Sequence, residues 1–155
     1  MPIDKGIPKW ITASLATHFS EAITELPVIV SGSKMKTDDL SEYCEIRVDG
    51  PNILEVSHEY WRVYAEINVL ITSVIDKNAY KIERLCGDVV SAFTSGLKIY
   101  KYGNTLEDDA SLVMCMTRID QERDFIKLSH FGQIETGVDL EQSTVEAHYV
   151  GYLKG

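Results

Sequence analysis

The segment Tyr60–Thr72, YWRVYAEINVLIT, places the strongest constraint on how this chain can fold. Apolar residues occupy every second position from Trp61 to Ile71, and larger or polar residues stand between them. A period of two over 13 residues predicts a β-strand with one face against a hydrophobic core. At about 3.3 Å per residue the strand spans roughly 40 Å, well beyond the usual five or six residues. We expect such a strand either to project past its own domain or to form the shared spine of a sheet.

The residues before this strand predict a β-hairpin or meander that covers 43–73. Tyr43–Asp49 alternates in the same way, and Ile53–Ser57 begins a further strand that runs into the long one. Between them, the sequence Asp49-Gly50-Pro51-Asn52 predicts a turn, because glycine allows positive φ and proline cannot extend a ladder. The long second arm makes the predicted hairpin an extended one.

Two amphipathic helices are predicted from apolar residues at helical spacing. The first follows a short extended arm over 1–7, begins at Pro8 and is stopped by Pro27. The second covers Ala79–Ser95, with Asp76 or Asn78 as its cap and Gly96 after its last turn. Each helix carries one apolar stripe, so both are expected to pack against a sheet.

Further short runs predict the remaining strands. A β-α-β unit with a right-handed crossover is expected if the strands on either side of the second helix are parallel. The sequence predicts an α+β fold in which two helices pack on a largely antiparallel, mixed β-sheet with an extended β-hairpin, in a single domain over 1–155. The predicted strands outside the hairpin are Val28–Val30, Leu97–Tyr102, Leu112–Ile119, Phe125–Phe131 and Val145–Leu153.

The net charge of the chain limits the classes of partner that it can bind. Fifteen Lys and Arg residues against 24 Asp and Glu residues give a net charge of −9, which argues against general affinity for the phosphate backbone of nucleic acids. The acidity serves either solubility or a surface past which DNA slides without sticking. No apolar run approaches the roughly 20 residues of a membrane span, and we expect neither a signal peptide nor contact with a membrane.

No motif predicts catalysis, a metal site or a cofactor, so the chain is not expected to be an enzyme. Cys44, Cys86 and Cys115 lie in apolar patterns and are expected to be reduced, buried thiols. The four histidines lack metal-ligand spacing. His130 and His148 fall on predicted strands and can meet across a sheet. With Cys115, they are the only support for a small ligand-binding domain or enzyme as an alternative.

The eight tyrosines exceed what the core needs. Tyrosine combines apolar area with a polar tip and is enriched in interfaces, although half-buried strand aromatics are an equally good explanation. Several tyrosines lie on strand faces expected to meet solvent, beside charged residues of the long strand. The candidate interface to another subunit or a tube is Tyr43, Tyr60, Arg62, Tyr64, Glu66 and Tyr152.

The order of elements over Pro8–Val30, Tyr43–Thr72, Ala79–Ser95 and Ser143–Leu153 resembles that of the tail terminator proteins of long-tailed bacteriophages. The resemblance implies a homohexameric ring that caps the finished tail tube and offers a docking surface for the filled head, while DNA passes through without specific binding. The implied partners are further copies of the chain, the tail tube protein and a head-completion or connector protein.

The same resemblance implies a place in the tail or neck of the virion, after assembly in the host cytoplasm. An acidic lumen would repel the DNA backbone, and the acidic run Glu107, Asp108 and Asp109 is the candidate for it. That run lacks the spacing of an EF-hand and is otherwise a solvated loop. Related structural subunits, namely head-closure and tail-tube proteins, share parts of this plan and remain alternatives.

Overall fold

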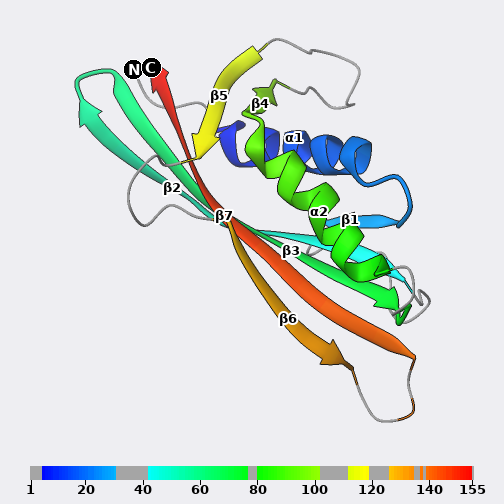
Figure 1. Cartoon of the computed structure of the whole chain (residues 1–155). Coiled ribbons are helices and arrows are strands. Elements are labelled where there is room, and N and C mark those ends of the chain that lie inside the picture. Colours follow the sequence, from blue (N-terminus) through cyan, green and yellow to red (C-terminus); the bar gives the residue numbers. More distant parts are fainter. Residues whose placement is uncertain are drawn as a thin grey trace.

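The computed structural model describes residues 5–30, 42–76, 80–101, 112–118, 126–134, 137 and 139–154. Over these residues two helices, α1 (Ile7–Ala22) and α2 (Lys81–Thr94), pack on one face of a seven-stranded sheet, as Figure 1 shows. The α+β class is therefore confirmed. The strands are β1 (Val28–Val30), β2 (Tyr43–Ser57), β3 (Tyr60–Val74), β4 (Leu97–Tyr100), β5 (Leu112–Arg118), β6 (Lys127–Gln133) and β7 (Leu140–Lys154).

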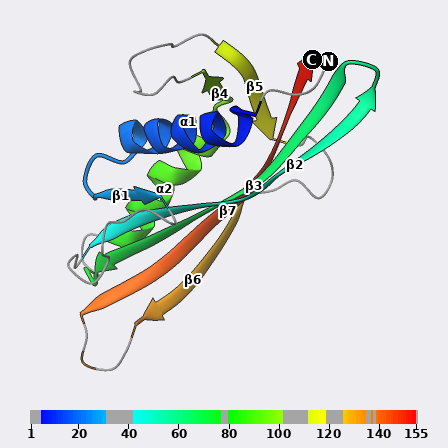
Figure 2. The same ribbon diagram turned by 180° about the vertical axis from the view of Figure 1, so that it is seen from behind.

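The sheet is organised around the pairing of β3 with β7. Its strand order is β1-β2-β3-β7-β5-β4, and β6 pairs with β7 outside this path. β1 runs parallel to β2, and the other pairings are antiparallel. β3 and β7 pair from Tyr60 opposite Lys154 to Val74 opposite Leu140. β5 and β6 diverge from β7 in both views (Figures 1 and 2) because they pair with different parts of its other edge.

The core lies between this spine and the two helices. Val63, Ala65 and Ile67 of β3 are fully buried, as the period of two predicts. The ring of Phe93 on α2 packs against Phe19 of α1 at 5.2 Å and against Tyr149 of β7 at 5.9 Å between centroids. These contacts fix the helices on one face and leave the other face of β2, β3 and β7 without a helix (Figure 2).

The predicted turn at 49–52 is wrong. β2 continues through it to Ser57, and the chain reverses at His58–Glu59, where Glu59 has a φ of 65°. Asp49 pairs with Glu66 and Asn52 with Tyr64, so two residues stand opposite Ala65 as a bulge. Proline is tolerated there because β1 covers only Cys44–Ile46 of this edge, and beyond Ile46 no strand among the described residues needs a donor from it.

The helix boundaries and the expected crossover also differ. α1 begins at Ile7, which shortens the predicted arm. It ends at Ala22, before Pro27, because the backbone of Ile23 turns to an extended conformation (φ −111°, ψ 98°) while its N–H still donates to the Phe19 carbonyl at 2.8 Å. Tyr80 is the N-cap residue of α2 and makes no side-chain cap bond, while the alternative cap Asn78 lies outside the described residues. The antiparallel series β3-β7-β5-β4 makes β3 and β4 antiparallel, so the condition for a right-handed β-α-β crossover is not met.

Candidate assembly surface and a carboxylate–histidine cluster

The helix-free face of the sheet carries all six residues of the predicted interface. Arg62 stands opposite Tyr152 in the register of β3 and β7, two residues from Tyr64 and four from Glu66 on the same face of β3. Tyr43 and Tyr60 lie on this face too, but at opposite ends of β3, beside Thr72 and Lys154 respectively. The structure therefore places Arg62, Tyr64 and Glu66 in one row on this face, with Tyr152 beside Arg62, and it separates the other two.

The distal ribbon, Asn52–Ser57 with Tyr60–Arg62 and Tyr152–Lys154, extends past both helices (Figure 1). Apolar side chains are exposed on it: Leu54 keeps 63% of its surface and Val56 58%. They alternate with Ile53, which is also exposed, so both faces of this end carry apolar groups. Exposed contiguous apolar surface of this kind is typical of a binding surface rather than of an isolated monomer.

Two donors within the distal ribbon are buried without a partner. Trp61 Nε1 and Arg62 Nε are the only buried side-chain polar atoms for which the described part of the chain offers no hydrogen-bond partner. A buried unmade hydrogen bond costs about 1–3 kcal/mol. The described fold therefore leaves two hydrogen-bond donors of the distal ribbon without an acceptor.

A cluster of ionisable side chains lies at the middle of the helix-free face. Glu66 pairs with His148 across β3 and β7, and Glu146 follows on the same face of β7. His148 Nδ1 lies 2.5 Å from the Tyr64 hydroxyl, and its Nε2 lies 3.9 Å from Glu146 Oε1. One ligand atom from each of Glu66, Glu146 and His148 lies within 4.8 Å of the others.

The surroundings of Glu66 favour the protonated form of its carboxyl group. A hydrogen bond to Glu146, partial burial and repulsion by the Glu146 charge together raise the pKa of Glu66. Such a pair retains a proton more readily than an isolated carboxylate, or it holds a cation in its place. We refer to Glu66, Glu146 and His148 as the carboxylate–histidine cluster.

Sequence reasoning missed this cluster. The spacing of Glu146 and His148, two residues apart on a strand, was a usable signal, since it places both on one face. Their meeting with Glu66 depends on the register of strands about 80 residues apart in the chain, which spacing alone does not give. The expected meeting of His130 with His148 does not occur: His130 accepts or donates a bond with Ser143 Oγ at 2.8 Å and lies opposite Ser143, not on the face of Glu66.

The cysteines do not form a nucleophilic site with these histidines. Burial raises the pKa of Cys44 to about 12 and also raises that of Cys86, so both thiols stay protonated at neutral pH. Cys115 is exposed on β5, which contradicts the expectation that all three are buried. The convergence of His130, His148 and Cys115, on which the enzyme alternative rested, is not found among the described residues.

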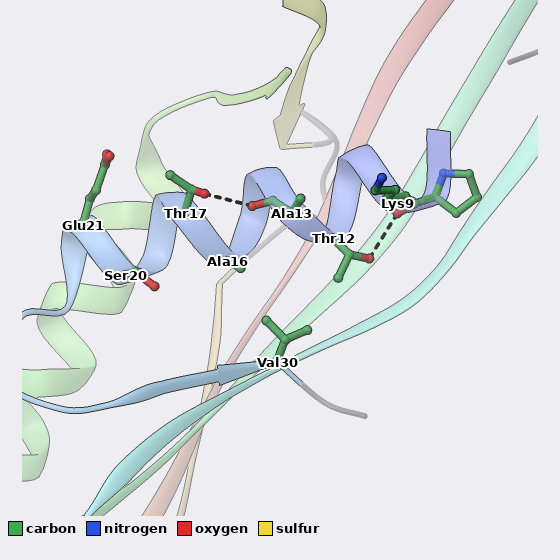
Figure 3. Close-up of a pocket in the computed structure, with 9 residues that line it drawn as sticks. Lys9, Thr12, Ala13, Ala16, Thr17, Ser20, Glu21 and Val30 are labelled. Carbon is green, nitrogen blue, oxygen red and sulfur yellow. Dashed lines mark hydrogen bonds between the residues drawn. The ribbon is translucent and has the colours of Figure 1, made fainter. Parts of the chain in front are cut away.

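An open groove of about 870 Å³ runs between α1 and the edge strand β1 (Figure 3). The hydroxyls of Thr12 and Thr17 donate to the carbonyls of Pro8 and Ala13 at 3.1 and 3.0 Å. This leaves mainly methyl groups of Thr, Ala13, Ala16 and Val30 to line the space. Among the described residues, the groove has no set of converging ionisable groups. Its lining suits contact with an apolar group rather than catalysis.

The predicted acidic lumen, Glu107, Asp108 and Asp109, lies outside the described residues. Its position relative to the sheet stays a prediction. Within the described ranges no helix is long and apolar enough to cross a membrane.

The comparisons with known proteins concern the fold alone. No protein-family model matches the chain, and no curated protein sequence matches it. Among solved structures 26 chains match it. One of them superposes with a TM-score of 0.54 at 16% identity, over 93% of this chain and 94% of that one. The chain thus shares its α+β architecture, over nearly its whole length, with a solved protein.

Proposed function

We propose that this chain is a structural subunit of a homo-oligomeric ring that caps a bacteriophage tail tube and joins it to the head. The observation that carries the proposal is the distal ribbon, whose apolar side chains, including Leu54 and Val56, are exposed past the helices. In a monomer the apolar side chains of this ribbon stay exposed to water and contribute no hydrophobic stabilisation. A second subunit that covers it removes apolar surface from water, at about 25 cal/mol per Å².

The free edge of β2 supports the same proposal. β1 pairs with β2 only over Cys44–Ile46, so the described residues leave the edge beyond Ile46 without a neighbouring strand. Exposed edges are a liability that proteins cover or use for pairing. When such a ribbon meets a different surface of the next copy, the contact is heterologous, and it generates a ring if the rotation closes. The extended hairpin predicted from 43–73 acts here as the arm that reaches a neighbouring subunit or the tube.

The charge of the chain suits a conduit for DNA. A net charge of −9 per subunit disfavours adhesion of the phosphate backbone, so DNA passes without specific binding. In this arrangement the tail tube protein and a head-completion protein bind opposite ends of the ring, within the tail or neck of the virion.

Native mass measurement tests the proposal directly. Six chains of 17.4 kDa give a ring of about 104 kDa, and we expect this species either in free solution or after addition of tail tubes. Leu54→Glu and Val56→Glu should abolish it, because each places a charge where the contact must be dry. Leu112→Glu is the matched control, since Leu112 is an equally exposed leucine on β5, 58% accessible.

A monomer that persists in the presence of tail tubes would contradict the proposal. If Leu112→Glu prevents assembly as Leu54→Glu does, the loss of assembly is not specific to the distal ribbon. The length of assembled tubes separates a terminator from a tail-tube subunit: a terminator stops growth after one ring, whereas a tube subunit lengthens the tube.

A further inference from the structure

We propose that Glu66, Glu146 and His148 bind a divalent transition-metal cation, with Zn²⁺ as its best representative, on the helix-free face of the sheet. The three side chains come from β3 and β7, the two central strands, whose pairing is unbroken around them. Their ligand atoms already lie within 4.8 Å of one another. The site is independent of the proposed ring, because a single chain supplies all three ligands.

The histidine distinguishes this cluster from an ordinary acidic patch. His148 Nδ1 is held by the Tyr64 hydroxyl at 2.5 Å, and Nε2 is the nitrogen that lies on the side of Glu146. When Nε2 binds a metal, Nδ1 carries the proton and donates it to the Tyr64 oxygen. Metal-binding histidines generally have such an outer hydrogen-bond partner, which fixes the tautomer and the orientation of the ring.

The charge balance of the cluster also favours a cation. Neither Glu66 nor Glu146 forms an ion pair with a Lys or Arg of the described ranges. Asp49 pairs with Glu66 across β2 and β3 and adds a third carboxylate to the same row. A bound divalent cation would relieve the repulsion between these carboxylates, which no ion pair to a Lys or Arg of the described ranges relieves.

The basic residues around the carboxylate–histidine cluster lower its affinity for a cation but do not occupy the site. Arg47 of β2 and Lys127 of β6 stand in the neighbouring row, which also contains Glu146. Arg62 lies four residues from Glu66 on β3. Each of them opposes a bound cation through space and therefore weakens its binding.

The donor set indicates the class of metal. Two carboxylate oxygens and one imidazole nitrogen, with positions left for water, suit Zn²⁺, Mn²⁺ or Fe²⁺ better than Ca²⁺, which prefers six to eight oxygen ligands. Zinc bonds of about 2.0–2.2 Å in a tetrahedron bring ligand atoms roughly 3.3–3.5 Å apart. The side chains therefore need to close by about an ångström, which rotation of the two glutamates supplies.

Zinc titration of the purified full-length chain by isothermal calorimetry tests the site. We expect one Zn²⁺ per chain, a loss of affinity of at least about tenfold in His148→Ala and Glu146→Gln, and a smaller loss in Tyr64→Phe. His58→Ala and His130→Ala are matched controls that remove a histidine elsewhere and should bind zinc as the native chain does. At one fixed zinc concentration, zinc should also raise the midpoint of thermal unfolding more in the native chain than in Glu146→Gln.

Two outcomes overturn the proposal: a native chain without saturable zinc binding, or a His148→Ala variant that binds as well as the native chain. Glu146→Gln preserves the shape of the side chain, so it gives a result even if His148→Ala fails to fold. The titration is repeated on Leu54→Glu, which separates the two proposals. If Leu54→Glu still binds zinc but no longer forms the ring, the metal site stands and only the assembly has been lost.

Discussion

At the scale of single residues, Tyr149 shows how one hydroxyl secures a helix to the sheet. Its side chain is fully buried, and its hydroxyl donates to the carbonyl of Phe93 at 2.6 Å. Phe93 lies in the last turn of α2, where carbonyls have no partner within the helix. The bond therefore satisfies an acceptor that the helix itself leaves open.

We expect Tyr149→Phe to lower the free energy of unfolding by about 1–2 kcal/mol, because it leaves the Phe93 carbonyl buried and unpaired. Urea denaturation at neutral pH measures the change. Tyr60→Phe is the control: Tyr60 is exposed, so removal of its hydroxyl should change stability by less than about 0.5 kcal/mol. Equal effects of the two substitutions would show that the Phe93 contact contributes nothing.

Glu42 connects the end of β3 to the start of α2. Its carboxylate accepts bonds from Ser73 Oγ at 3.0 Å, the Val74 N–H at 3.1 Å and Lys81 Nζ at 2.8 Å. Burial alone would raise the pKa of Glu42, but these three donors outweigh it and hold the pKa below its usual 4.5. In the unfolded chain the carboxyl group loses these donors and binds its proton more readily.

The sign of the pH dependence follows from this lowered pKa. The stabilisation by Glu42 is complete above its unfolded pKa and is lost as pH falls through the folded value. We expect Glu42→Gln to cost about 1–3 kcal/mol at pH 7 and progressively less below pH 4.5. Denaturation of both proteins across this range measures the difference, and a gap that stays constant into acid would refute the assignment.

At the scale of elements, the strands whose one face meets the helices were predictable. The alternation of Tyr60–Thr72 reflects a physical partition: its apolar residues from Val63 to Ile71 are buried against the helices, and the residues between face away. The signal fails in β2 beyond Asp49, where both faces are exposed and no alternation is imposed by a core. There the local turn chemistry of Gly50-Pro51 misled the prediction, because pairing with β3 overrode it.

Gly50 is required by this bulge. Its φ is +104°, and a Cβ atom added there would lie 2.9 Å from Asn52 N and 3.2 Å from the Tyr64 carbonyl oxygen, both backbone atoms. We expect Gly50→Ala to destabilise the protein by about 1–3 kcal/mol, since strained φ and backbone contact add together. Thermal unfolding measures the shift, and an unchanged midpoint would show that the bulge rearranges freely.

Gly87 provides the opposite case within α2. It is an exposed helical residue, and a Cβ atom there meets nothing within 4 Å. Alanine loses less backbone entropy than glycine on entering a helix, so Gly87→Ala should raise stability by up to about 1 kcal/mol. The same thermal measurement applies. A loss of stability would contradict the open surroundings of Gly87.

At the scale of the whole molecule, the sequence predicted which residues share a face of the sheet, but not which of them meet across strands. All six candidate interface residues do lie on one face, because strand alternation and the position of the core determine it. The carboxylate–histidine cluster depends on the register between β3 and β7, which is a property of the assembled sheet. The exposed end of the ribbon likewise depends on where the helices stop, which no local pattern records.

The charge of the whole chain gives the final prediction. Each chain carries −9, so neighbouring copies would repel one another in the proposed ring. The proposed contact through Leu54 and Val56 is apolar, so salt does not screen it. The Debye length falls from roughly 30 Å at about 0.01 M salt to about 10 Å at 0.1 M. We therefore expect the ring to become more populated as sodium chloride rises over this range, measured by sedimentation velocity at constant protein concentration. Leu54→Glu should remain monomeric throughout, because it adds charge and removes apolar contact together. Dissociation of the native ring with added salt would instead assign the interface to ion pairs, and the distal ribbon would lose its place as the surface that holds the subunits together.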